Sequence, residues 1–241
     1  MFDRKTVMHS LTQNGGVYAD VFSEDKTYTH IQLESGSIER IERAEVRGNG
    51  IRLITPWKTY YASTNSFDKT HLTDMAAQLA RLSKEENHPG NGHERVVTAS
   101  YPFSISINPD ETDIGRKVAL VKSLEQKVKK MDPRIVQVRI VYRDTLQKLE
   151  IGNSDGLTVR DERTQVVLNV FLVGQENGET QTSYEAVGGF SGFEFFSEQV
   201  VEELAIKVVK RLSGLFSARE APTGMKTVVL ASEAGGTMIH E

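Results

Sequence analysis

The chain has 241 residues, of which 38% are hydrophobic and 26% are charged, and its formal net charge is −4. This length and composition suit a globular protein with one large or two smaller domains, and the acidic balance argues against nucleic-acid phosphates as the main partner. Cysteine is absent, which excludes disulfides and thiolate chemistry within these residues.

Targeting signals are not evident. Met1 to Lys5 are not followed by an apolar core, so no secretory signal is expected. No apolar run approaches the roughly 20 residues that span a bilayer, so no membrane partner is expected. We therefore expect a cytoplasmic protein.

A first unit is predicted over residues 1–90. Val7 and Leu11 lie on one face of an expected helix over residues 3–13, which Asn14-Gly15-Gly16 ends. Period-two alternation then predicts a meander of four or five antiparallel strands, with a turn at Ser35-Gly36 and a tight hairpin at Gly48-Asn49-Gly50. The expected strand segments are residues 18–22, 27–33, a strand beginning near 38, 51–55 and 58–63. An amphipathic helix over residues 68–86 closes the unit, with inward positions at Leu72, Met75, Ala76, Leu79 and Leu82.

A linker follows over residues 91–113. Three of the six prolines lie in or just before it, namely Pro89, Pro102 and Pro109, and this is typical of a domain boundary. A short strand is expected near residues 104–107.

A second unit, residues 114–241, repeats the same order of elements. Its helix over residues 114–131 ends at Asp132-Pro133. Strands are predicted over residues 135–143, 147–152, 157–173 and 179–186, and a second helix over residues 200–216. The fold class is therefore predicted as α+β, built from two helix–antiparallel meander–helix units, and a structural duplication would explain the repeated order.

The final residues carry the main chemical signal. After a short strand predicted over residues 226–230, Gly235-Gly236 leads into a helix that bears His240-Glu241. A histidine followed by a glutamate on a helix can supply an imidazole ligand for zinc and a carboxylate that polarises the metal-bound water. A frayed surface pair is the simpler interpretation, and a second pair, His93-Glu94, lies in a predicted loop. Because Met238 and Ile239 are apolar, we expect this helix to continue in a longer parent protein.

Three stretches, in the same order along the chain, resemble the TldD/PmbA metallopeptidase family, also called modulators of DNA gyrase. The first spans residues 19–65 and includes Leu33-Glu34-Ser35-Gly36 and Arg47-Gly48-Asn49-Gly50. The second spans residues 132–156 and includes Ile151-Gly152-Asn153-Ser154-Asp155-Gly156. The third is Thr227-Val228-Val229-Leu230 with Gly235-Gly236 and His240-Glu241, and it resembles the TldD branch, which carries the metal motif.

The resemblance implies a function and a site. The family motif is His-Glu-x-x-x-His with a further ligand, typically cysteine, from a C-terminal domain. His240 would match the first metal ligand and Glu241 the catalytic glutamate, whereas the other ligands have no counterpart in these residues. The resemblance thus implies the N-terminal and central domains of a zinc peptidase that acts on flexible or unfolded peptides, as a homodimer or with a PmbA-type partner. The fragment itself is expected to be inactive.

The alternative is a non-catalytic binding or assembly subunit of a peptidase dimer. A role in binding gyrase or DNA has little support from an acidic chain. Lysines 117, 122, 127, 129 and 130 are interpreted as a solvated helix face rather than a DNA contact. The glycine- and aromatic-rich segment 188–193 is interpreted as a hairpin end that packs its aromatic side chains, although it could also line a peptide channel or a subunit contact.

Overall fold

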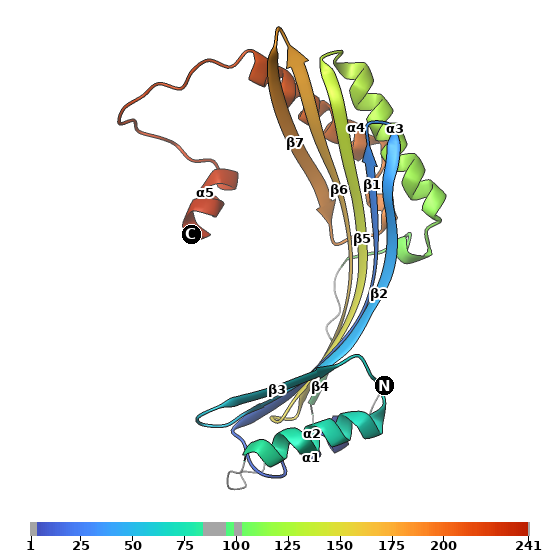
Figure 1. The fold of residues 1–241 in the computed structure, drawn as a ribbon, viewed down its shortest axis with the longest axis vertical. Coiled ribbons are helices and arrows are strands. Elements are labelled where there is room, and N and C mark those ends of the chain that lie inside the picture. The colour runs from blue at the N-terminus through green and yellow to red at the C-terminus, as the bar shows by residue number, and fades with distance from the viewer. Residues whose placement is uncertain (1–3, 84–94, 99–102, 241) are drawn as a thin grey trace.

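The computed structural model describes residues 4–83, 95–98 and 103–240 (Figure 1). The elements follow in the order α1 (Arg4–Thr12), β1 (Tyr18–Glu34), β2 (Ser37–Ile54), β3 (Thr59–Thr64), α2 (Lys69–Ser83), β4 (Arg95–Thr98), η1 (Pro109–Glu111), α3 (Ile114–Met131), β5 (Ile135–Asn153), β6 (Leu157–Glu176), β7 (Glu179–Gly189), η2 (Phe193–Phe195), α4 (Glu198–Phe216) and α5 (Ser232–His240). The α+β class is therefore confirmed. Among the described residues, no helix is both long and apolar enough to cross a lipid bilayer.

One sheet runs through both predicted units. Its strand order is β3-β2-β1-β5-β6-β4, and β7 pairs with β6. Every pairing is antiparallel except that of β4 with β6. The two meanders are joined because β1 pairs with β5 along fifteen positions, from Asp20 opposite Asn153 to Glu34 opposite Arg139. The division into an N-terminal domain, a linker and a central domain stays a prediction.

The hairpin predicted at residues 48–50 is wrong. Gly48 and Gly50 lie inside β2 and keep an unbroken register against Glu24 and Phe22 of β1. Neither glycine has a positive φ. A Cβ atom on Gly50 would lie 2.6 Å from the hydroxyl oxygen of Tyr61, so this glycine makes room for a neighbouring side chain rather than a turn.

Other strand predictions also differ from the structure. Residues 18–22 and 27–33 belong to one strand, as do residues 135–143 and 147–152, because both flanking strands continue the hydrogen-bonding ladder across the polar positions between them. Residues 104–107 form no strand; the backbone N–H groups of Ser106 and Ile107 instead donate to the Glu194 carboxylate at 3.0 and 2.8 Å. Residues 226–230 form an exposed coil.

The helices α1 to α4 cover the same face of the sheet. On β1 the odd-numbered residues Ala19 and Val21 pack in the cluster with α1 and α2, whereas Ile31 and Leu33 pack in the cluster with α3 and α4. Because alternate residues of a strand share a face, both clusters lie on one side of the sheet. Figure 1 shows this helix-bearing side as the outer side of a curved sheet, and we call the opposite side the concave face.

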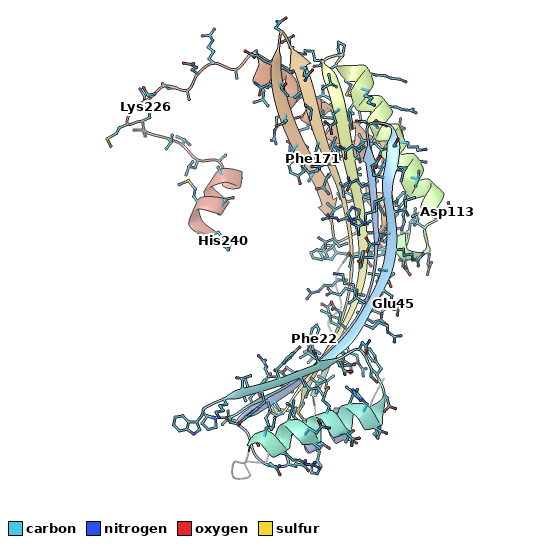
Figure 2. The ribbon with its side chains drawn as sticks, in the orientation of Figure 1. Phe22, Glu45, Asp113, Phe171, Lys226 and His240 are labelled. Carbon is cyan, nitrogen blue, oxygen red and sulfur yellow. The ribbon has the colours of Figure 1, made fainter. Side chains whose placement is uncertain are left out.

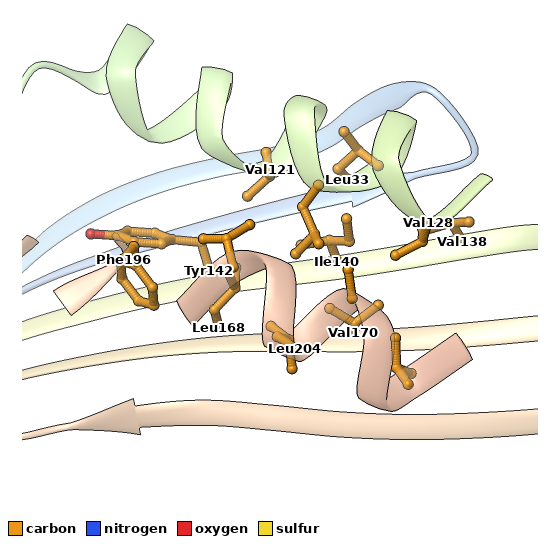
Figure 3. Packing of buried hydrophobic residues seen from close by; sticks show 14 of the residues in the cluster. Leu33, Val121, Val128, Val138, Ile140, Tyr142, Leu168, Val170, Phe196 and Leu204 are labelled. Atoms are coloured by element: carbon orange, nitrogen blue, oxygen red, sulfur yellow. The ribbon is translucent and has the colours of Figure 1, made fainter. Parts of the chain in front are cut away.

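The larger cluster packs α3 and α4 against the central strands of the sheet. Figure 3 shows Val121 of α3 and Leu204 of α4 against Ile140 and Leu168 of the central strands. Burying a leucine side chain fully stabilises a fold by about 1.5–3 kcal/mol. One predicted inward position is wrong: Leu82 is 58% exposed, and Ala80 and Ser83 are buried on that part of α2 instead.

Candidate functional site

The predicted metal ligand His240 is the last residue of α5 (Figure 2). A helix was predicted to follow Gly235-Gly236, whereas α5 begins at Ser232 and includes both glycines. Its first turn is closed by the Gly235 N–H, which donates to the Ala231 carbonyl oxygen at 2.8 Å. The His240 side chain is exposed, and α5 stands apart from the sheet at the end of a coil over residues 217–231. Glu241 lies outside the described residues.

A complete metal site is not present among the described residues. No group of three or more His, Cys, Asp or Glu side chains there could hold an ion. His240 offers one imidazole, whereas a catalytic zinc ion takes three protein ligands and a water molecule. The residues that are described therefore do not complete a site for zinc. His88 and the pair His93-Glu94 lie outside the described residues.

The segment that carries His240 is strongly apolar and exposed. The apolar side chains that are largely open to solvent are those of Met225, Val228, Val229, Met238 and Ile239. Apolar side chains that gather on a surface often mark a contact with another part of a protein or with a partner. We therefore treat this segment as a candidate interaction element.

A polar network lies on the concave face near the middle of the sheet. His30 of β1 is paired with Glu42 of β2 and with Arg143 of β5 in the strand register. Partial burial and the positive charges of Arg143 and Arg40 lower the pKa of His30, which favours a neutral imidazole at pH 7. The Tyr28 hydroxyl donates to Glu42 at 2.8 Å, and this hydrogen bond lowers the pKa of the Glu42 carboxyl.

A second polar network is closed inside the core between α3 and the sheet. Lys117 is 1% exposed, and its ammonium lies 2.6 Å from the Asp144 carboxylate and 3.2 Å from the Thr29 hydroxyl. The Tyr142 hydroxyl also donates to Asp144, at 2.7 Å. Burial and the neighbouring Asp144 charge raise the pKa of Tyr142 far above its ordinary value.

The buried position of Lys117 corrects the prediction of a solvated basic stripe. Lys122, Lys129 and Lys130 are exposed as predicted, and the half-buried Lys127 forms an ion pair with Glu202. Lys117 instead faces the sheet. Because the polar network around Lys117 is shielded from solvent, we infer that this network stabilises the fold and does not form a binding site.

The aromatic segment after β7 packs against the core. The Phe193 ring lies 6.2 Å from the Tyr142 ring, and the Phe190 ring is stacked on Phe103 at 5.6 Å. These contacts support the predicted packing of the aromatic side chains, although the segment connects β7 to η2 and α4 and is not the turn of a hairpin.

Two family models match the chain in consecutive order. The model described as PmbA/TldA metallopeptidase domain 1 matches residues 19–83, and the model of the PmbA/TldA metallopeptidase central domain matches residues 107–215. The chain belongs to the PmbA/TldD metallopeptidase family. Both models end before α5, so the assignment of this chain to the PmbA/TldD family does not depend on His240.

Curated relatives in the PmbA/TldD family are named as metalloproteases. A metalloprotease from Methanocaldococcus jannaschii is 27% identical over 234 residues, which are 94% of this chain and 50% of the relative. A metalloprotease TldD homolog from Haemophilus influenzae is 26% identical over 235 residues, which are 93% of this chain and 48% of the relative. The chain thus spans about half the length of the curated relatives that it matches.

Solved structures share the fold of this PmbA/TldD chain. A Thermotoga maritima protein named as a modulator of a DNA gyrase has a TM-score of 0.70 and 17% identity, over 91% of this chain and 49% of its own. TldE from Thermococcus kodakarensis has a TM-score of 0.66 and 13% identity, over 87% of this chain and 47% of its own. At these identities the likeness concerns the fold alone.

Proposed function

We propose that this chain is the N-terminal half of a zinc-dependent peptidase that hydrolyses flexible or unfolded peptides. The observation that carries the proposal is the match to two consecutive PmbA/TldD domains, followed by a helix that ends in His240. The names of the metalloprotease relatives support the reaction class.

The proposal assigns roles to the last two residues. His240 supplies one neutral imidazole ligand, and the remaining ligands come from sequence outside these 241 residues. When bound, the zinc ion would supply Lewis acidity and lower the pKa of a water molecule. Glu241 would act as general base toward the attacking water and would then return the proton to the leaving amine. The exposed apolar surface of α5 then packs against the other half of the whole protein.

Chelation tests the proposed reaction. The full-length protein, treated with a chelator, should lose hydrolysis of an unstructured peptide and regain it when zinc is added. The 241-residue chain, assayed in parallel, should bind no zinc tightly and should release no product, since its described residues offer an incomplete ligand set. Undiminished hydrolysis by a full-length protein verified to be metal-free would contradict the proposal.

A non-catalytic subunit of a peptidase dimer is the second candidate. The likeness in fold to TldE is the observation that favours it. The sequence after Glu241 discriminates the two functions: a histidine four residues beyond Glu241 supports the enzyme, whereas its absence supports the binding subunit. Pairing with a copy of itself or with a PmbA-type partner, and a cytoplasmic location, stay predictions under either function.

A further inference from the structure

An arginine and two aromatic rings form a row across three strands of the concave face. Arg139 of β5 lies opposite Phe171 of β6, and Phe171 lies opposite Tyr184 of β7. The Arg139 guanidinium carbon is 4.3 Å from the centre of the Phe171 ring, and the rings of Phe171 and Tyr184 are 4.6 Å apart. The Tyr184 hydroxyl is fixed by a 2.9 Å hydrogen bond to the Asn169 side chain.

The Arg139 guanidinium has no carboxylate partner among the described residues. Glu34 lies directly opposite it on β1, but the Glu34 carboxylate accepts from the Gln137 amide at 2.6 Å instead. Two other arginines of the sheet do have carboxylate partners: Arg160 pairs with Glu150, and Arg52 pairs with Asp20. An exposed guanidinium held on an aromatic ring without a counter-ion is preorganised to receive an anion.

A pocket opens over this row. Its volume is about 300 Å³, and its lining includes Gln137, Arg139, Phe171, Thr182 and Tyr184. This volume lies at the lower end of the range for small-molecule sites, so it can accept one or two side chains rather than a folded partner. Tyr184 is 43% exposed, and therefore offers an apolar surface next to the cationic group.

We propose that this pocket binds an acidic side chain of an extended peptide together with a neighbouring apolar or aromatic side chain. The planar guanidinium of Arg139 matches a carboxylate in two parallel hydrogen bonds, and the Phe171–Tyr184 surface takes the apolar neighbour. The proposal deepens the proposed function, since it names a class of peptide, and it rests on that function for the identity of the ligand as a peptide.

A nucleic acid fits the pocket less well. Aromatic rings beside arginine can also stack on bases. Sites that bind single-stranded nucleic acid, however, also have a positively charged groove that runs along the phosphate backbone. The chain carries a formal net charge of −4, and among the described residues that line the pocket only Arg139 is cationic. Charge and shape therefore favour a single carboxylate over a chain of phosphates.

Peptide binding by the 241-residue chain tests the proposal. Acetyl-Gly-Phe-Glu-Gly-amide is titrated and followed by two-dimensional NMR in the presence of a chelator, beside the analogue with Gln in place of Glu. The glutamate peptide should bind about tenfold more tightly, because hydrogen bonds to a charged group are stronger than those to a neutral amide. Arg139→Gln should remove that advantage, and Arg139→Lys, which keeps the charge without the planar fork, should retain part of it.

Arg143→Gln is the matched control. Arg143 lies four residues along β5 on the same face, so its loss changes the charge of the face equally but leaves the pocket intact. It should alter binding less than twofold, and unchanged melting temperatures would show that all variants are folded. Equal binding of the two peptides, equal losses for Arg139→Gln and Arg143→Gln, or tighter and Arg139-dependent binding of a single-stranded oligonucleotide would each overturn the proposal.

The outcome separates this site from the reaction. Binding is measured without metal, so it does not depend on zinc chemistry. If the full-length protein hydrolyses peptides but the 241-residue chain does not bind them at this pocket, only the proposed pocket is contradicted. If peptides bind at the pocket but hydrolysis persists after the metal is removed, only the proposed zinc-dependent reaction is contradicted.

Discussion

Replacing Glu241 with glutamine in the full-length protein is expected to lower kcat for peptide hydrolysis by about 10²- to 10⁴-fold, the usual contribution of a general base. The amide has almost the shape of the carboxylate but cannot accept a proton from water. Because the proposal gives Glu241 no role as a ligand, the metal content should stay unchanged. Rate measurements on an unstructured peptide, with metal analysis of the same sample, check both expectations.

Glu220→Gln is the control for this experiment. Glu220 is exposed in the coil before α5. Its replacement by glutamine therefore removes the same charge at a position outside the helix. It should leave kcat within about twofold, as expected for a surface substitution. If Glu241→Gln behaved like Glu220→Gln, Glu241 would not be the proton acceptor.

Lys117→Ala is expected to lower the free energy of unfolding by about 3–5 kcal/mol, the cost of leaving one member of a buried ion pair without its partner. Asp144 would stay buried, with the Tyr142 hydroxyl as a remaining hydrogen-bond donor. Urea unfolding followed by circular dichroism measures the change. The loss should be of similar size for Asp144→Ala, and the double variant should cost less than the sum, because it leaves neither charge alone.

Lys122→Ala supplies the comparison within the same helix. Lys122 is exposed on α3, so its removal should change the unfolding free energy by less than about 0.5 kcal/mol. A loss below about 1 kcal/mol for Lys117→Ala would show that the buried ion pair does not support the fold as argued.

The helices were predictable because their signals are local. The predicted range 114–131 coincides with α3, where Val121, Leu124 and Val128 share one face and Asp113 accepts from the Gly115 N–H at 2.8 Å. The spacing of apolar residues and the capping residue can both be recognised from neighbouring positions in the sequence, without knowing which distant residues the helix contacts. The helix α5 was predicted from its His-Glu pair instead, and its start was misplaced, because α5 begins at Ser232 and includes Gly235 and Gly236.

The burial of Lys117 was also readable from the sequence. Lys117 lies four residues before Val121, on the face that carries the apolar residues, and Asp144 continues the even-numbered inward positions of Ile140 and Tyr142. The prediction gave more weight to the charge of the side chain than to its position. Burial of two charges becomes credible only when both positions are seen to face each other.

Strand limits and the concave pocket depend on contacts between distant residues. Polar residues within β1 and β5 suggested breaks, but pairing with strands on both sides carries the ladder through them. The row of Arg139, Phe171 and Tyr184 requires the register of three strands, which no local pattern specifies. The metal site could not be assembled from the sequence either, because His240 is the only metal ligand that was predicted within these 241 residues.

The central claim is that His240 belongs to a zinc site, and zinc stoichiometry of the full-length protein with and without His240→Ala tests it most directly. The account predicts about one zinc ion per chain in the unmodified protein, and loss of both the zinc and peptide hydrolysis in the variant, since a catalytic site needs three protein ligands. A His240→Ala protein that keeps its zinc and its rate of hydrolysis would contradict the account.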